Sequence, residues 1–207
     1  MRLARLALGL VLILAAAPAA GHHVGVWTAR DNEVSTNFKQ IKFALQAGKL
    51  DVARQLYESG ALRRDLLAQA ARLPAGLDAS IRNALAAGDA RAAERGLMVF
   101  FVALSRDLAR EADRQLAEPG ALPEARLASS RKFLEAIWRY YNLVDFAVTQ
   151  YDPKAATAVR LALDEAEGYT KSAAAPDLDR LRGPFQQMVR VLTGVIETSA
   201  TSARRKS

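Results

Sequence analysis

The sequence has no cysteine and two histidines in 207 residues, so several kinds of chemistry have no residues to carry them. Without cysteine there is no disulfide, c-type haem attachment, Cys-ligated zinc, iron–sulfur cluster, thiol nucleophile or lipid-anchor cysteine. The chain also lacks a glycine-rich phosphate loop and a serine-centred nucleophile elbow. These absences leave the familiar catalytic routes without support, and we expect a protein that is not an enzyme.

Strand signals are missing as well, because no run of β-branched and aromatic residues alternates with polar residues between turns. Aromatic residues make up 7% of the chain, whereas apolar residues make up 51% and charged residues 25%, as in globular proteins. Alanine, leucine and arginine, which are good helix formers, are frequent. We therefore predict an all-α fold, a bundle of about six to eight helices.

Helical periodicity, glycines and prolines divide one predicted domain, residues 31–198, into two short helical hairpins followed by three or four longer helices. Asp31 or Ser35 is the expected cap of the first helix, and Asp152 followed by Pro153 is the expected start of another. The predicted helices cover residues 31–47, 51–60, 61–73, 78–87, 90–116, 123–151, 154–167 and 177–198.

The two short hairpins resemble each other in sequence. Six residues of the first recur in the second at a shift of forty positions: Ile41, Ala44, Leu45, Ala47, Gly48 and Ala53 become Ile81, Ala84, Leu85, Ala87, Gly88 and Ala93. Two copies are fewer than a solenoid needs, so we interpret them as similar hairpins inside a bundle. A fragment of a repeat and chance similarity between alanine-rich hairpins both remain open.

The amino terminus has the three parts of a secretory signal peptide. Arg2 and Arg5 are followed by an apolar run over residues 6–17 and by small residues suited to cleavage. We predict that residues 1–19 are removed, that residues 20–30 form a mobile leader, and that the protein is exported to the periplasm. An uncleaved amino-terminal anchor is the alternative.

The positive charge lies mostly at the two ends of the chain. The formal net charge of +7 falls to +5 without Arg2 and Arg5, and to +2 without the three basic residues of the tail, residues 199–207. Basic and acidic residues are interleaved elsewhere, so we expect no nucleic-acid partner. The tail, which we expect to be disordered, is suited to contact with anionic lipid headgroups.

The histidines are candidate metal ligands because of where they lie. Cleavage after Ala19 or Ala20 places His22 or His23 third in the mature chain. A free amine, two backbone amides and an imidazole then form the square-planar nitrogen set that copper(II) prefers. Cleavage after Gly21 instead exposes His22 as the first residue, which still chelates copper. The alternative is that two histidines in a mobile leader have no role.

The segment 138–146 is the most distinctive stretch, because it alternates aromatic with polar residues. Trp138, Asn142 and Asp145 share one helical face, and Tyr140 lies nearby in the sequence. We predict these four residues to be a partner-binding surface. Core packing of the aromatic rings, with their polar tips hydrogen-bonded, is the alternative.

Three sequence blocks resemble the periplasmic amino-terminal region of bacterial high-affinity iron permeases. The blocks are Leu143-Val144-Asp145-Phe146, Tyr151-Asp152 and Asp164-Glu165-Ala166-Glu167. The small-residue hairpins also resemble iron-uptake proteins of the imelysin type, although their His-containing metal motif is absent. These resemblances imply an exported helical domain that serves metal uptake, and they carry over no residue roles.

We therefore expect an exported, non-catalytic helical bundle that acts as an accessory in periplasmic transition-metal handling. The resemblance implies iron, whereas the histidines at the processed terminus favour copper. The alternative is a metal-free interaction module that docks an envelope or membrane-protein partner, such as a transporter, through the aromatic segment.

Overall fold

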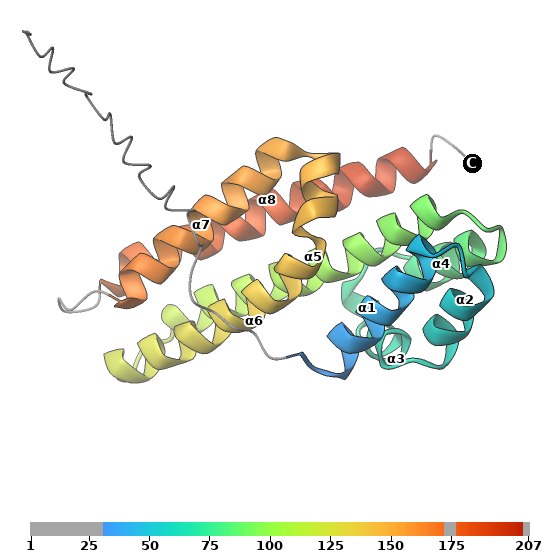
Figure 1. Ribbon diagram of the computed structural model, residues 1–207. Helices are drawn as coiled ribbons and strands as arrows, with labels where there is room; N and C mark the ends of the chain where they lie inside the picture. Colours follow the sequence, from blue (N-terminus) through green and yellow to red (C-terminus); the bar gives the residue numbers. More distant parts are fainter. Residues whose placement is uncertain (1–30, 172–176, 205–207) are drawn as a thin grey trace, which may run out of the picture.

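The computed structural model describes residues 31–171 and 177–204, and within these ranges it contains helices and no strand (Figure 1). The all-α prediction is confirmed. The eight helices are α1 Glu33–Gln46, α2 Leu50–Ser59, α3 Ala61–Ala68, α4 Leu77–Ala86, α5 Ala90–Leu116, α6 Pro123–Tyr151, α7 Pro153–Lys171 and α8 Leu178–Arg204, with a 3₁₀ turn, η1, at Ala70–Arg72.

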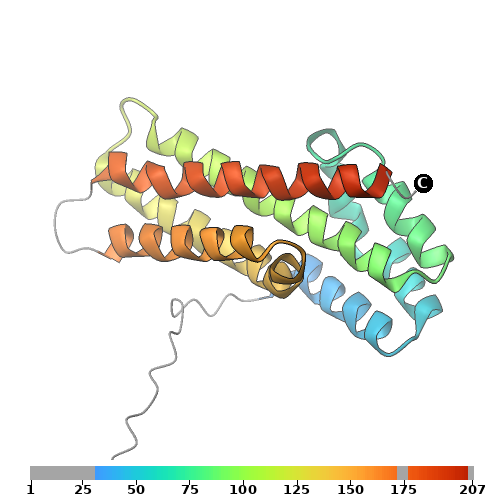
Figure 2. The ribbon, with the colours of Figure 1, turned by 90° about the horizontal axis from the view of Figure 1, so that it is seen from above.

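Two groups of helices meet along α5. The long helices α5, α6, α7 and α8 pack side by side as a bundle, while α1 to α4 gather around the amino-terminal half of α5 (Figures 1 and 2). The apolar run over residues 97–104 lies almost wholly inside this contact, because every one of its side chains is buried. Helix α5 is therefore the element that joins the two groups.

The two similar hairpins have the same backbone turn. In the first, the N–H of Gly48 binds the carbonyl of Leu45 at 3.1 Å, and the N–H of Lys49 binds the carbonyl of Ala44 at 2.9 Å. The corresponding bonds after α4 measure 3.3 and 2.9 Å. Gly48 and Gly88 have φ values of 69° and 73°. Residues with a side chain rarely adopt such positive φ values, whereas glycine adopts them freely. The forty-residue similarity thus corresponds to one helix-ending motif used twice.

Several helix ends differ from the predictions for local reasons. Asn32 caps α1, rather than Asp31 or Ser35, because its side chain accepts from the N–H of Ser35 while the Ser35 hydroxyl accepts from the N–H of Asn32. Helix α3 ends at Ala68, not at residue 73, and a 3₁₀ turn at Ala70–Arg72 takes the place of its last residues. Pro74 explains why this turn does not continue, since the residue before a proline favours an extended conformation, as Leu73 has.

The last helix is longer than the prediction allowed. It continues past Ser199, where the disordered tail was expected to begin, and ends at Arg204. Ser199 is 3% exposed, so the helix is still packed at that point. The prediction at the start of α7 is confirmed, since the carboxylate of Asp152 accepts from the N–H of Ala155 at 2.9 Å and Pro153 is the first helical residue.

None of the helices in the described residues is both long enough and apolar enough to cross a membrane.

Candidate functional site

The predicted metal ligands His22 and His23 lie in the segment 1–30, outside the described residues. Within residues 31–171 and 177–204, no group of three or more His, Cys, Asp or Glu side chains is arranged to hold a metal ion. The metal hypothesis therefore rests on His22 and His23, and the described residues neither support nor test it.

Two of the four predicted partner-binding residues, Trp138 and Tyr140, are half-buried against the core. The Tyr140 hydroxyl accepts a hydrogen bond from Nδ2 of Asn32 at 2.9 Å, and its ring lies 5.8 Å from that of Phe101. Tyr140 thus ties α6 to the start of α1. This contact joins residues 108 positions apart, and no local sequence pattern points to it.

The other two predicted residues differ in their surroundings. Both oxygens of Asp145 accept from the guanidinium of Arg160 on α7, at 2.9 and 2.6 Å, and this hydrogen bonding raises the pKa of Arg160. Asn142 is exposed. The carboxylate of Asp145 therefore joins α6 to α7, and it is not free to bind a partner without releasing Arg160.

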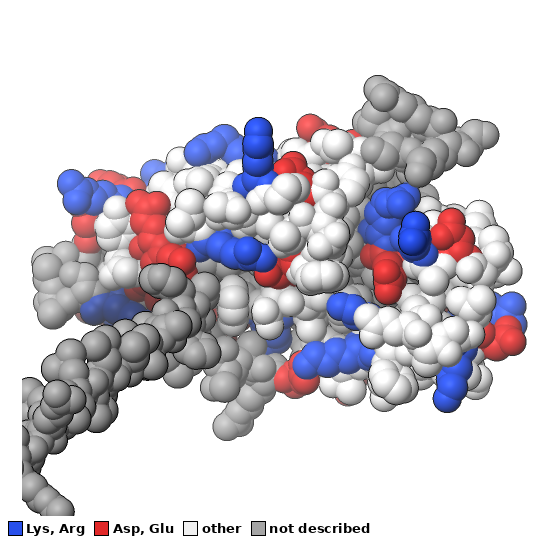
Figure 3. All heavy atoms as spheres, turned by 45° about the horizontal axis from the view of Figure 1, so that its top comes forward, with Lys and Arg blue, Asp and Glu red and all other residues white. Residues whose placement is uncertain are grey.

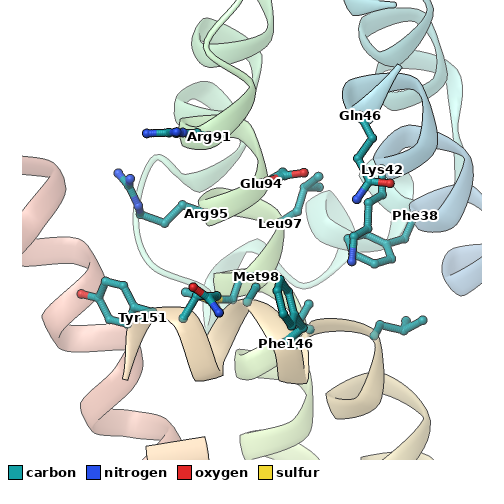
Figure 4. A pocket seen from close by; sticks show the side chains of 14 residues that line it. Phe38, Lys42, Gln46, Arg91, Glu94, Arg95, Leu97, Met98, Phe146 and Tyr151 are labelled. Carbon is teal, nitrogen blue, oxygen red and sulfur yellow. The ribbon is translucent and has the colours of Figure 1, made fainter. Parts of the chain in front are cut away.

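A cavity of about 300 Å³ lies where α1, the start of α5 and the end of α6 come together (Figure 4). We call it the junction cavity. It is lined by Phe38, Lys42, Gln46, Arg91, Glu94, Arg95, Leu97, Met98, Leu143, Val144, Phe146, Ala147, Gln150 and Tyr151. Sequence reasoning missed this site, because its residues come from three separate parts of the chain.

The floor of the junction cavity is apolar. Phe38, Leu97, Met98 and Val144 are buried there and belong to the main core. Phe146 rises from α6 between the two sides of the cavity in Figure 4, and it is 68% exposed although its ring is large and apolar. Exposed apolar side chains are common, and Phe43 is 71% exposed without lining the cavity, so it is the position of Phe146 beside an apolar floor that makes its ring available to a ligand.

The rim carries positive charge. Arg91 and Arg95 extend from α5 toward the side where Tyr151 lies, and Lys42 comes from α1 on the opposite side (Figure 4). None of these three cations forms an ion pair with any described residue. Glu94 is the single acidic residue of the lining, so the rim has an excess of positive charge.

The start of α5 determines where Arg91 lies. Asp89 caps the helix by accepting from the N–H of Ala92 at 2.9 Å, and Arg91 therefore lies in the first turn. The helix dipole is positive at this end and disfavours a cation there by about 0.3–1 kcal/mol. An anion bound beside Arg91 would be attracted by this side chain, whereas the helix end itself already holds the carboxylate of Asp89.

A second hollow, of about 280 Å³, has a different character. Asp107 and Glu111 line it, but each is already paired with arginine, Asp107 with Arg106 at 2.8 Å and Glu111 with Arg114 at 2.6 Å. The hydrogen bonds from Arg114 lower the pKa of Glu111 to about 2. These carboxylates are paired within the protein, whereas Arg91 and Arg95 of the junction cavity form no ion pair with a described residue, and Lys42 Nζ only lies 6.0 Å from the centroid of the Phe38 ring.

Elsewhere the charged residues are mixed. On the face shown in Figure 3, basic and acidic side chains lie next to each other and form no continuous basic stripe. Ion pairs such as Arg54 with Asp51 at 3.0 Å and Arg114 with Glu118 at 3.2 Å follow the same pattern.

Comparison of the chain with protein-family models, with curated proteins and with solved structures finds no match. The resemblance to iron-uptake proteins stays a prediction. The described residues thus form a helical protein with an amphipathic cavity whose two arginines form no ion pair within the described ranges.

Proposed function

We propose that this protein is an exported, non-catalytic binding module of the periplasm, and that the junction cavity holds its ligand. The observation that supports the proposal is an apolar cavity of about 300 Å³ with three cations at its rim, none of which forms an ion pair with a described residue. Small-molecule sites have this composition, a mostly apolar wall with a few placed polar groups, and volumes from about 300 Å³ upward.

The lining favours binding over chemistry. Its polar members are Lys42, Gln46, Arg91, Glu94, Arg95, Gln150 and Tyr151, and no serine, cysteine or histidine is among these described residues. Arginine stays protonated at physiological pH and donates hydrogen bonds without exchanging protons with a substrate. A wall of this kind positions an anion.

A neutral apolar dye tests whether the cavity is used. N-phenyl-1-naphthylamine should bind the purified protein and gain fluorescence as it enters the cavity. Ala147→Phe would place a large ring in the cavity and should abolish the signal, since Ala147 is half-buried in its wall. Phe146→Ala should weaken dye binding severalfold, because one wall of the site is lost.

Phe43 supplies a matched control for Phe146. It is 71% exposed, compared with 68% for Phe146, but it does not line the junction cavity. Phe43→Ala therefore removes the same exposed ring from outside the site and should leave dye binding unchanged. Circular dichroism must show equal helicity in all variants. Equal dye affinity in Phe43→Ala, Phe146→Ala and Ala147→Phe would contradict the proposal.

A role as an accessory in copper or iron handling is the second candidate, and the observation that favours it is the position of His22 and His23 near the predicted cleavage point. Amino-terminal sequencing of the exported protein locates the cut. Copper titration of the mature protein should then give tighter binding than titration of the alanine variant of the histidine that the cut makes third, or of His22→Ala if the cut follows Gly21. Equal affinity in all three proteins would exclude the site.

Docking of an envelope partner through α6 is supported by the neighbouring exposed side chains Asn142 and Phe146. Asn142→Ala and Phe146→Ala should then both weaken capture of a partner while leaving the fold intact. Trp138→Ala separates the alternatives, because Trp138 packs against the core. A loss of helicity in that variant assigns Trp138 to packing.

A further inference from the structure

The junction cavity combines three features that restrict its ligand, namely its size, its apolar floor and the placement of its cations. The inference below rests on the proposed function, since it names the class of molecule that the same site takes. The cavity volume of about 300 Å³ comes first. A chain of roughly ten methylene groups fills such a space, if each takes the ~30 Å³ of a water molecule.

The size excludes a two-chain lipid and favours a single apolar chain. The floor residues Phe38, Leu97, Met98 and Val144 offer carbon and sulfur surface and no hydrogen-bonding side-chain group. A flexible hydrocarbon chain binds such a floor without leaving a polar group unsatisfied.

The charges define the other end of the ligand. Arg91 and Arg95 are four residues apart on α5, so their side chains project from the same face of the helix. Neither guanidinium group forms an ion pair with another residue of the described ranges. Two such groups on one helical face repel each other, and a carboxylate between them would accept hydrogen bonds from both. Glu94 lies between them in sequence, but it forms no ion pair with either among the described residues.

From these observations we propose that the junction cavity binds a medium-chain fatty acid, with its carboxylate at Arg91 and Arg95 and its chain over the floor beneath Phe146. Lys42 stands on the opposite side of the cavity (Figure 4), so it contributes to the overall attraction without contacting the carboxylate. Figure 4 shows the two arginines on one side and Phe146 between the sides, as this orientation requires.

Isothermal titration calorimetry with octanoate, decanoate and dodecanoate, below their micelle-forming concentrations, tests the chain. Affinity should rise about tenfold for each two methylene groups while buried apolar area increases. It should then level off near ten to twelve carbons, where the cavity is full. Affinity that continues to rise with chain length at the same rate would show binding to an open apolar surface and overturn the proposal.

Decanol tests the head group, because it has the same chain and no charge. Decanoate should bind about tenfold more tightly than decanol. The double variant Arg91→Gln/Arg95→Gln should remove this difference by weakening decanoate and leaving decanol unchanged. Lys42→Gln should have a smaller effect on decanoate than the double variant has.

Arg110 and Arg114 provide a matched control on the same helix. They have the same spacing as Arg91 and Arg95 and the same charge, but they lie toward the other end of α5 and pair with Asp107 and Glu111. Arg110→Gln/Arg114→Gln changes the net charge equally and should leave decanoate affinity unchanged. An equal loss in both double variants would show that general electrostatic attraction, not the cavity, binds the carboxylate.

The outcomes separate this inference from the proposed function. If the naphthylamine dye binds and Ala147→Phe blocks it, while decanoate binds no better than decanol, the cavity is a binding site and the fatty-acid assignment is wrong. If decyl phosphate binds more tightly than decanoate, and this binding depends on Arg91, the assignment of a carboxylate as the head group is wrong. If neither dye nor decanoate binds a folded protein, both proposals fail, and an acidic peptide of a partner becomes the next occupant to test.

Discussion

Gly96 lies on α5 where Ile81 of α4 packs against it, and its replacement tests how tightly the second hairpin is packed. A Cβ atom at this position would come within 2.4 Å of Cγ1 of Ile81, and within 3.3 Å of its Cδ1. Ile81 is 0% exposed and lies within α4. Its β-branched side chain is held in one rotamer by the helix, so Cγ1 cannot turn away freely.

Two opposing effects determine the free energy of unfolding of Gly96→Ala. Alanine in a helix interior is favoured over glycine by roughly 0.5–1 kcal/mol. Forcing an extra methyl group into a filled core costs about 1–3 kcal/mol. The steric cost is at the upper end here, because the clash is with an atom next to the branch point. We expect a net loss of about 1–2 kcal/mol.

Urea denaturation followed by circular dichroism measures this loss, and a thermal scan should show a decrease in Tm on the order of 5 °C. Gly194→Ala is the matched control, because Gly194 is also inside a long helix and its added Cβ would meet nothing within 4 Å. That variant should gain roughly 0.5–1 kcal/mol. If Gly96→Ala stabilised the protein as much as Gly194→Ala does, the close packing of α4 on α5 would be refuted.

A double-mutant cycle locates the cost at the named contact. Ile81→Ala in the parent protein should cost about 2–5 kcal/mol, because it leaves a cavity in the core. The same change in the Gly96→Ala background should cost less, since the new methyl group occupies part of the vacated space. We expect a coupling free energy of about 1–2 kcal/mol. Additive effects would place the strain of Gly96→Ala elsewhere.

Two further predictions concern the joints between the short helices. Asn37 is 7% exposed, and its side-chain amide donates to a carbonyl of α2 at 3.1 Å and accepts from an N–H of α3 at 3.0 Å. Asn37→Ala should therefore lower the free energy of unfolding in urea by about 2 kcal/mol. Asn142→Ala, at an exposed position, should change it little. The hydrogen bond from Arg63 lowers the pKa of Asp78 below its ordinary 3.8. Ionised Asp78 therefore contributes its full share to the folding free energy above pH 3.8, and this share is lost as the pH falls below 3.8 through the lowered pKa. Urea midpoints measured from neutral pH downward should therefore fall less steeply in Asp78→Asn than in the parent protein. Asp51 has a side chain that is 93% exposed, so Asp51→Asn should leave the pH dependence of the urea midpoint unchanged.

The helices were predictable where the chain carries its own boundary signals. The bounds of α5 and α6 agree with the prediction because Pro119 and Gly120 interrupt the helical pattern and Pro123 restarts it. The turns at Gly48 and Gly88 were recognisable for the same reason, since a glycine after a helical run marks a helix end. These signals act within a few residues, so no tertiary information is needed to interpret them.

The junction cavity was not predictable, because it depends on which helices pack together. Lys42, Arg91 and Phe146 are about fifty residues apart in sequence, and each has an ordinary local context. Helical periodicity places Phe146 off the buried stripe that contains Val144 and Val148, but it does not tell whether another helix covers that side. Contacts of this kind, like the hydrogen bond from Asn32 to Tyr140, require the fold itself.

The two hairpins begin alike and then diverge, and this divergence accounts for the cavity. Forty positions after Gly60, which ends α2, the chain has Phe100, which is 0% exposed inside α5. A glycine that packs against Asn37 lets the first hairpin turn into α3, whereas an apolar run at the same place extends the second into the bundle. Helix α5 therefore belongs to both halves of the molecule. Its first turns, which carry Arg91, line the junction cavity together with α1 from one half and the end of α6 from the other.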